Sequence, residues 1–238
     1  MKILLTNDDG YNSEGILLLK EKLQKYGEVT IVAPFEHMSA KSASITLMKW
    51  VKVDKIDEHT YAVHGTPTDC TSYALSELGE DFDLVVSGCN NGPNLSYDVL
   101  LSGTVGACFG AAVHRIKTVA FSSPFDDFSC CKERFEEVFE FILNNNLLSK
   151  DYILNVNFPR GEYKGIAIGQ LYYRHDRYYN DTKDDTYYAL RDIENFENMP
   201  KNADCRQVKE GLISIVPLLR APYDERIYEQ LLKKVQNK

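Results

Sequence analysis

The sequence predicts an α/β fold built on a largely parallel sheet, and three observations support this prediction. Short apolar runs alternate with segments of helical period through the first two-thirds of the chain, which is typical of repeated β-α units. The apolar runs are rich in branched residues and lack the polar alternation of a half-exposed strand. With 238 residues and 44% hydrophobic content, the chain can bury a sizeable core.

Five candidate strands and four candidate helices follow one another in this region. The strands are expected to be buried on both faces because their apolar runs are not interrupted by polar residues. They are Lys2 to Thr6, Val29 to Ala33, Leu84 to Ser87, Thr118 to Phe121 and Ile153 to Val156. The candidate helices are Gly15 to Tyr26, Asp69 to Leu78, Thr104 to His114 and Lys132 to Leu147.

A segment of different character begins near Tyr172, where tyrosines mix with charged residues and no helical apolar stripe is present. We expect a hairpin or arm that leaves the main sheet. Two interpretations of it stay open, an oligomer contact or a solvated extension with amphipathic tyrosines. The chain then returns to a strand at Leu212 to Val216 and finishes with an amphipathic helix. The expected domains are a core at 1–168, an arm at 169–210 and a returning strand and helix at 211–238.

The composition narrows the class of ligand and the compartment. A formal net charge of -8 argues against nucleic acid or an anionic membrane as a partner and favours a small ligand. The six cysteines are scattered without a C-x-x-C pair, which indicates reduced, mostly buried thiols. The first apolar run ends at Asn7 and is too short for a signal peptide or a membrane span, so we expect a cytoplasmic protein.

The strongest local motif is Thr6-Asn7-Asp8-Asp9-Gly10, directly after the first strand. A continuing strand would point Asp8 and Asp9 to opposite faces. A turn at Gly10 would instead bring both carboxylates to one side, where a divalent cation is the simplest compensation for two close anions. The alternative is that Asp8 or Asp9 only caps the following helix.

Two further strand ends carry polar groups that suit the same cation. Ser39 lies in the loop after the second strand, and Asn90 to Asn94 follow the strand at Leu84 to Ser87. Loops after the strands of an open parallel sheet gather at the carboxyl ends, where ligands bind. Carboxylate, hydroxyl and amide oxygens favour Mg²⁺ or Mn²⁺ over zinc or copper. An ordinary turn is the alternative for Asn90 to Asn94.

A candidate phosphate-binding segment, Ser102-Gly103-Thr104, precedes a helical segment. Gly103 would let the backbone approach closely, the two hydroxyls would face the phosphate, and so would the first free N–H groups of the helix. Helix capping is the alternative role for Ser102 and Thr104. For Gly65 to Asp69, another turn into a helix, capping is the favoured interpretation.

These motifs belong to a longer ordered set that extends over nearly the whole chain. The set consists of Ile3 to Gly10, Val32 to Pro34 with Ser39 and Ser42, Gly65 to Cys70, Asp83 to Asn94, Leu101 to Gly106, Leu154 to Pro159 and Gly211 to Leu218. Together these residues resemble the SurE survival-protein family of metal-dependent nucleotide phosphatases. Three residues depart from the family pattern: Met38 and Ala40 stand where Arg-Ser-Gly is usual around Ser39, and Cys89 replaces a common aliphatic residue.

The resemblance implies a Rossmann-like three-layer α/β/α core with a mainly parallel sheet, plus a hairpin arm and a C-terminal helix that are exchanged within a homodimer or homotetramer. It implies hydrolysis of nucleoside 5'- or 3'-monophosphates, and in some members of short polyphosphate. It also implies one divalent cation per subunit, held by Asp8, Asp9, Ser39 and Asn90. The substrate phosphate would lie near Asn94, Ser102, Gly103 and Thr104.

Asp8 is the expected principal ligand, whereas Asp9 is either a second ligand or the general base. A phosphoaspartyl phosphatase is a rival, but it requires Asp-x-Asp spacing and these aspartates are adjacent. A regulatory module that binds a nucleotide without chemistry is a second rival. A Ser-His-Asp hydrolase is disfavoured, because the chain has no G-x-S-x-G elbow and its histidines lack triad companions.

Overall fold

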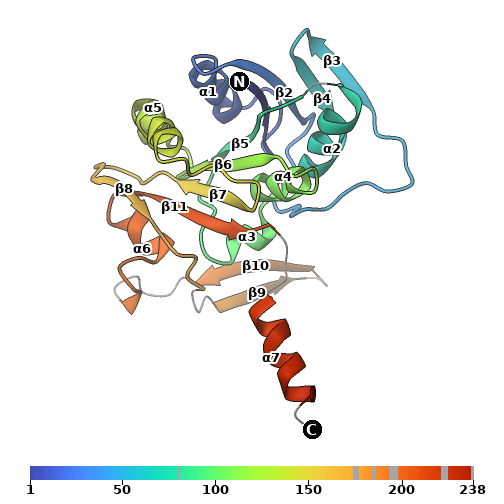
Figure 1. Ribbon diagram of the computed structural model, residues 1–238. Coiled ribbons are helices and arrows are strands. Elements are labelled where there is room, and N and C mark those ends of the chain that lie inside the picture. The colour runs from blue at the N-terminus through green and yellow to red at the C-terminus, as the bar shows by residue number, and fades with distance from the viewer. Residues whose placement is uncertain (80, 174–176, 184–185, 193–197, 221–224, 237–238) are drawn as a thin grey trace.

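A nine-stranded sheet forms the centre of the molecule, with the strand order β3-β4-β2-β1-β5-β6-β7-β11-β8 (Figure 1). The computed structural model describes residues 1–79, 81–173, 177–183, 186–192, 198–220 and 225–236. The strands are β1 (Lys2–Thr6), β2 (Glu28–Pro34), β3 (Val53–Asp57), β4 (Thr60–Val63), β5 (Leu84–Asn91), β6 (Lys117–Ser123), β7 (Tyr152–Asn157), β8 (Gly165–Ile168) and β11 (Leu212–Leu219). Neighbours from β4 to β7 are parallel, whereas β3 pairs antiparallel with β4 and β11 with β7.

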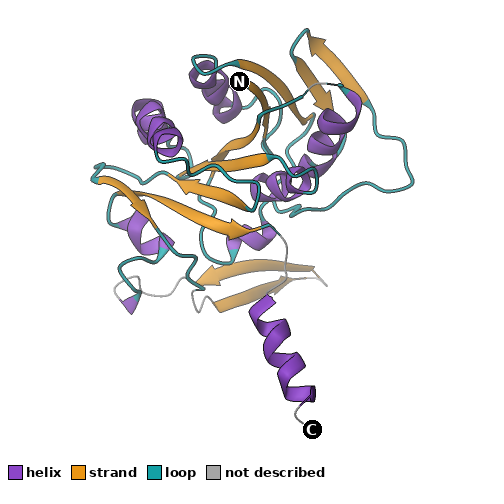
Figure 2. Ribbon diagram, viewed as in Figure 1, coloured by secondary structure: helices purple, strands orange, loops and turns teal. Residues whose placement is uncertain are grey.

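Helices cover both faces of this sheet, which confirms the predicted three-layer α/β/α core (Figure 2). The side chains of β1 explain the layers, because alternate residues of a strand point to opposite faces. Ile3 and Leu5 pack in one cluster with residues of α1 (Glu14–Leu23) and α5 (Ser129–Asn144). Leu4, between them, packs in a second cluster with residues of α2 (Pro67–Glu77) and α4 (Gly103–Ala112).

The strand order reverses at β1. From β1 the chain moves outward through β2 and β4, and it then returns to place β5, β6 and β7 on the other side of β1. In open α/β sheets such a reversal opens a crevice at the carboxyl ends of the two central strands, and ligands bind there. We therefore expect a ligand site among the residues that follow β1 and those at the end of β5.

Several elements differ from the sequence prediction. The strands β3, β4 and β8 and the helices α3 (Asp98–Leu101) and α6 (Asp204–Lys209) were not predicted, since each is too short to carry a clear periodic pattern. The predicted helix Lys132 to Leu147 is wrong by three residues at each end. Its C-terminus falls earlier because Asn146 adopts a φ of 52°, a left-handed conformation that stops a helix.

The hairpin expected after Tyr172 is present as the antiparallel pair β9 (Arg177–Lys183) and β10 (Thr186–Asp192). Beyond β11, the helix α7 (Glu225–Gln236) extends away from the sheet (Figure 1). Its side chains Ile227, Leu231 and Val235 are 55%, 55% and 73% exposed, so its apolar face is uncovered in a single chain. None of the helices in the described part of the chain has the length and apolar content that a membrane crossing requires.

Candidate metal and phosphate site

The turn after β1 presents Asp8 and Asp9, and Asn7 holds this turn closed. The Asn7 amide nitrogen donates to the Gly10 carbonyl at 2.9 Å and to Ser13 Oγ at 2.7 Å. The Gly10 amide donates back to Asn7 Oδ1 at 3.2 Å, and Gly10 has a φ of 110° that favours glycine. Neither aspartate caps α1, because the N-cap is Ser13, so the capping alternative for Asp8 and Asp9 is wrong.

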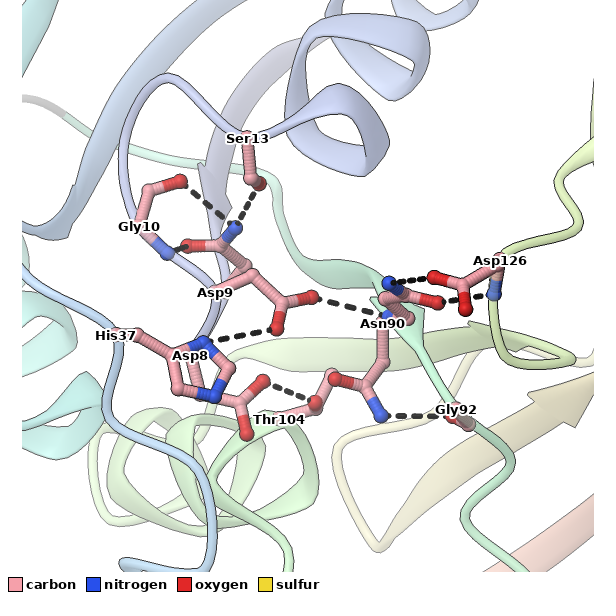
Figure 3. A network of polar contacts seen from close by, with 11 residues as sticks. Asp8, Asp9, Gly10, Ser13, His37, Asn90, Gly92, Thr104 and Asp126 are labelled. Atoms are coloured by element: carbon pink, nitrogen blue, oxygen red, sulfur yellow. Dashed lines mark hydrogen bonds and ion pairs between the residues drawn. The ribbon is translucent and has the colours of Figure 1, made fainter.

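Asp8 is buried, with only 3% of the residue exposed. Thr104 Oγ1 donates to Asp8 Oδ1 at 2.5 Å (Figure 3). Burial raises the pKa of Asp8 to about 6; the Thr104 hydrogen bond opposes this rise and the neighbouring Asp9 carboxylate adds to it. The site therefore holds a carboxylate whose negative charge is destabilised by its surroundings, which is the condition that a bound cation relieves.

The Asp9 carboxylate has two partners, Asn91 and His37. Its Oδ2 accepts a hydrogen bond from the Asn91 amide at 3.0 Å, and its Oδ1 lies 3.3 Å from His37 Nδ1 (Figure 3). Only 11% of the Asp9 side chain is exposed, whereas His37 is 63% exposed. Asp9 thus links the end of β1 to the end of β5 and to the loop after β2.

Asn90 belongs to β5 itself, not to a loop after it, because the strand continues to Asn91 beyond an irregularity in its pairing with β6. The Asn90 amide nitrogen donates to the Gly92 carbonyl at 2.7 Å, which leaves the amide oxygen available. In Figure 3 the side chain of Asn90 points to the side of the site where Asp8 and Thr104 lie. The predicted carboxylates and this amide are therefore brought together at the crevice between β1 and β5.

Ser39 lies at the edge of this group. It is exposed in a turn, directly after Met38, whose amide donates to the Asp8 carbonyl at 2.7 Å. Within the described residues its hydroxyl makes no hydrogen bond to either carboxylate. The backbone thus brings Ser39 to the rim of the site, while its side chain does not take part in the hydrogen bonds around Asp8.

The predicted phosphate-binding segment, Ser102-Gly103-Thr104, contacts Asp8. Ser102 is the N-cap of α4, and its Oγ accepts a hydrogen bond from the Val105 amide at 3.1 Å. A Cβ atom on Gly103 would lie 2.8 Å from the Cβ of Asp8, so glycine permits the close approach of the helix to the turn. Thr104 supplies the hydrogen bond to Asp8. The first turn of α4, with its free N–H groups, therefore faces the same crevice.

Asn94 has a different environment, because it is buried in a network of amides. Its side-chain nitrogen donates to Ser122 Oγ at 2.8 Å, and its main-chain carbonyl accepts from Asn155 and Asn157 at 2.8 and 3.1 Å. Its main-chain amide donates to Asn157 Oδ1 at 2.8 Å. In this structure Asn94 anchors the loop after β5 to β6 and β7.

Sequence reasoning missed Asn7 and Asp126. Asn91 and Asp126 exchange two hydrogen bonds, from Asn91 Nδ2 to Asp126 Oδ1 at 3.1 Å and from the Asp126 amide to Asn91 Oδ1 at 2.7 Å (Figure 3). Asn7 stood inside the recognised motif, but its role depends on contacts with Gly10 and Ser13. For Gly65 to Asp69 the capping interpretation is confirmed, since Thr66 and Asp69 form a reciprocal capping box.

The donor set fits a hard divalent cation. Two adjacent carboxylates, one buried, have neither a lysine nor an arginine as an ion-pair partner among the described residues. In the same part of the chain no group of three His, Cys, Asp or Glu side chains could hold a metal ion, so a zinc-type cluster is not formed there. Carboxylate and amide oxygens are ligands that Mg²⁺ and Mn²⁺ accept.

A hollow of about 730 Å³ lies away from these residues. Its lining includes Leu84 and Lys117, the first residues of β5 and β6, so it opens at the amino ends of the strands. The carboxyl ends hold the adjacent carboxylates and the helix N-terminus, which is the chemistry that a phosphate-handling site needs. We therefore assign the candidate site to the carboxyl ends and not to this hollow.

Comparisons with known proteins agree with this geometry. Residues 3–178 match the family model described as Survival protein SurE. The chain is 34% identical over 235 residues to "5'-nucleotidase SurE" of Clostridium botulinum (strain Alaska E43 / Type E3), covering 92% of this chain and 93% of that one. It is 37% identical over 228 residues to the protein of the same name from Histophilus somni (strain 2336), covering 92% of each. The crystal structure of the SurE protein from Aquifex aeolicus matches with a TM-score of 0.83 at 31% identity, covering 97% of this chain and 98% of that one.

Proposed function

The chain belongs to the SurE survival-protein family, and we propose on this basis that it is a divalent-metal-dependent phosphatase that hydrolyses nucleoside monophosphates. Curated relatives that carry the name 5'-nucleotidase SurE support the reaction class, a phosphoric monoester hydrolysis. The observation that carries the proposal is the hydrogen bond from Thr104 to Asp8. It joins the carboxylates suited to a cation to the helix N-terminus suited to a phosphate.

We propose that Asp8, Asp9, Ser39 and Asn90 hold one Mg²⁺ or Mn²⁺ ion per subunit. Support comes from the convergence of Asp8, Asp9 and Asn90, and from the raised pKa of Asp8, whose ionised form a cation would stabilise. Ser39 is proposed from its place at the rim, directly after Met38, whose amide donates to the Asp8 carbonyl. When bound, the cation would neutralise phosphate charge and lower the pKa of a bound water.

The substrate phosphate is proposed to lie at the first turn of α4. Gly103 and Thr104 would offer main-chain N–H groups to its oxygens, and the hydroxyl of Ser102 can donate while its oxygen caps the helix. Asn94 is proposed to act through the loop that it anchors, since its side-chain nitrogen already donates to Ser122. These groups would stabilise the charge on the transferring phosphoryl group.

The roles of the two aspartates are proposed to differ. Thr104 directs one oxygen of Asp8 and leaves the other for the cation, so Asp8 is the principal ligand. Asp9 accepts from the Asn91 amide and lies beside His37, which suits either a second ligand or a base that takes a proton from the attacking water. Mass spectrometry of a quenched reaction tests the covalent alternative, because a phosphorylated Asp8 or Asp9 would establish a phosphoaspartyl route.

The central test measures phosphate release from a panel of nucleotides with Mg²⁺, with Mn²⁺ and with a chelator. We expect the wild-type protein and an Asp151→Asn control, which alters an exposed carboxylate, to release phosphate only with a metal. Asp8→Asn is expected to lose at least about 100-fold in rate with an unchanged circular dichroism spectrum. Nucleotide binding without phosphate release by the wild type would favour a regulatory module, and wild-type rates in Asp8→Asn would refute the role of Asp8.

The same panel of nucleotides tests which phosphate position and which phosphate chain length the enzyme accepts. We propose that both 5'- and 3'-monophosphates, and short polyphosphates, enter the site, since a bound cation and the N-terminus of α4 would attract any terminal phosphate. Nucleic acid is not a proposed substrate, in agreement with the net charge of -8. A cytoplasmic location is proposed because all six cysteines are free and buried, as expected in a reducing compartment.

A homodimer or homotetramer is proposed, with contacts through the arm at 169–210 and the helix in 211–238. Support comes from α7, which extends from the sheet with Ile227, Leu231 and Val235 exposed on one face (Figure 1). An uncovered apolar helix face of this kind is normally buried against a partner. Light scattering after size exclusion should give a mass of two or four chains, and a monomer at all concentrations would refute the proposal.

A further inference from the structure

Phe125 is a phenylalanine exposed at the rim of the candidate site. It lies in the loop between β6 and α5, and 65% of the residue is exposed. Exposing an aromatic ring to water forgoes the free energy of burying it. Phe125 differs from other exposed apolar side chains in the contacts that fix its loop beside the site.

The loop that carries Phe125 is fixed from several sides. The Gly92 amide donates to the Ser123 carbonyl at 3.0 Å, and Arg160 Nη2 donates to the Phe125 carbonyl at 2.5 Å. The two hydrogen bonds between Asn91 and Asp126 hold the residue directly after Phe125. Asn91 also donates its main-chain amide to Asp9, so the same residue positions a carboxylate of the site and the loop of the ring.

The Phe125 ring lies against Gly92, one contact from the site. A Cβ atom on Gly92 would lie 2.6 Å from Phe125 Cε1, and Gly92 has a φ of 142°, so glycine is required here both for space and for backbone conformation. The Gly92 carbonyl accepts the hydrogen bond from Asn90 Nδ2. The ring therefore contacts the glycine that holds the side chain of a proposed metal ligand, and this contact places it beside the site.

Other exposed aromatic rings differ from Phe125. Phe35 already stacks with two rings, Tyr11 at 6.0 Å and His64 at 4.2 Å between ring centroids. Trp50 is wholly exposed, but within the described residues no ring contact or hydrogen bond holds its side chain. No ring of the described residues stacks on Phe125, so a face of it is available to a ligand.

We propose that Phe125 is the stacking surface for the nucleobase of the substrate. This inference rests on the proposed function and adds a base subsite to the metal and phosphate groups. Stacking on an aromatic ring tolerates every base, because each has a π-face, and it grows with the area of the base. The subsite therefore selects nucleotides over non-aromatic phosphate esters, and purine nucleotides over pyrimidine nucleotides.

The test compares two substrates in each variant, AMP and glycerol phosphate, which share a phosphate monoester but not a base. The measured quantity is the ratio of kcat/KM for AMP to kcat/KM for glycerol phosphate. We expect Phe125→Ala to lower this ratio about tenfold, chiefly through KM for AMP, and Phe125→Trp to restore it. The fall should be larger for AMP than for CMP.

Two matched variants are the controls. Phe35→Ala removes a ring that already stacks with Tyr11 and His64. Trp50→Ala removes an exposed ring that has no ring contact or hydrogen bond among the described residues. Both variants should keep the wild-type ratio. An unchanged ratio in Phe125→Ala, or a fall confined to Phe35→Ala or Trp50→Ala, would overturn the proposal.

Calorimetric binding of AMP to the wild type and to Phe125→Ala separates this inference from the proposed function. If the wild type released phosphate from neither substrate, the proposed function would fail. The binding measurement would still decide the role of Phe125, since an equal affinity for AMP in both proteins would refute stacking and an affinity about tenfold weaker in the variant would support it.

Discussion

Thr104 donates a 2.5 Å hydrogen bond to the carboxylate of Asp8, and this contact joins two segments that lie far apart in the sequence. One is the turn after β1 and the other is the first turn of α4. Because Asp8 is buried, Thr104 determines which of its two oxygens remains available to a cation. Metal binding and phosphate binding are therefore expected to respond together when this contact is altered.

Thr104→Val removes the hydroxyl and keeps the shape of the side chain. Loss of a hydrogen bond that orients a metal ligand typically lowers metal affinity or activity by about 10- to 100-fold, and we expect a loss in this range. The measurement is phosphate release as a function of Mg²⁺ concentration. Thr104→Ser keeps the donor and should remain close to the wild type, while a fully active Thr104→Val protein would contradict the role of this contact.

Gly103→Ala tests the close approach of α4 to Asp8. The added Cβ would lie 2.8 Å from both Cβ and Oδ2 of Asp8, so the helix or the turn must shift. Overpacking of this kind typically costs about 1–3 kcal/mol in the free energy of unfolding. We expect this loss in urea denaturation, together with reduced phosphate release. Unchanged stability and activity would show that the turn can move freely.

Phe135 tests the packing of α5 on the sheet. Its ring is fully buried. The centroid of the ring lies 5.1 Å from that of Phe121 and 5.5 Å from that of Phe139. Phe135→Ala is expected to lower the free energy of unfolding by about 3–5 kcal/mol, because it removes apolar contacts and leaves a cavity. Val113→Ala, at an 80% exposed position, is the control and should change it by less than about 0.5 kcal/mol.

The lowered pKa of Glu136 should make the stability of the fold depend on pH. Burial raises its pKa, but hydrogen bonds from Lys25 and Lys22 outweigh burial and bring the pKa down to about 2. A lowered pKa stabilises the folded state above the unfolded value, and this contribution is lost as the pH falls from about 4.5 towards 2. Glu136→Gln should therefore cost about 1 kcal/mol at pH 7 and less at pH 3.5 in urea unfolding.

An exposed glutamate, Glu58, provides the control for this measurement. Glu58→Gln should have a small effect of similar size at both pH values. A Glu136→Gln effect that did not shrink at the lower pH would show that the charge of Glu136 contributes nothing through Lys22 and Lys25.

The central strands of the fold could be predicted from the sequence because burial on both faces requires continuous apolar runs. The strand β3 reads Val-Asp-Lys-Ile-Asp and is mostly exposed at the sheet edge, so its sequence carries no such signal. Asp8 and Asp9 could be proposed as metal ligands from the sequence because adjacent carboxylates directly after a strand are chemically unusual. The roles of Asn7 and Asn94 depend on partners at Gly10, Ser122 and Asn157, which only the folded chain brings into contact.

The reactivity of the buried cysteines can report local unfolding of the molecule. Cys70, Cys108 and Cys131 lie on α2, α4 and α5, and burial raises the pKa of each thiol, so they are both shielded and protonated in the folded state. An alkylating reagent can reach each of them only when its own layer opens. The order in which they are labelled should thus reveal which face of the sheet is uncovered first.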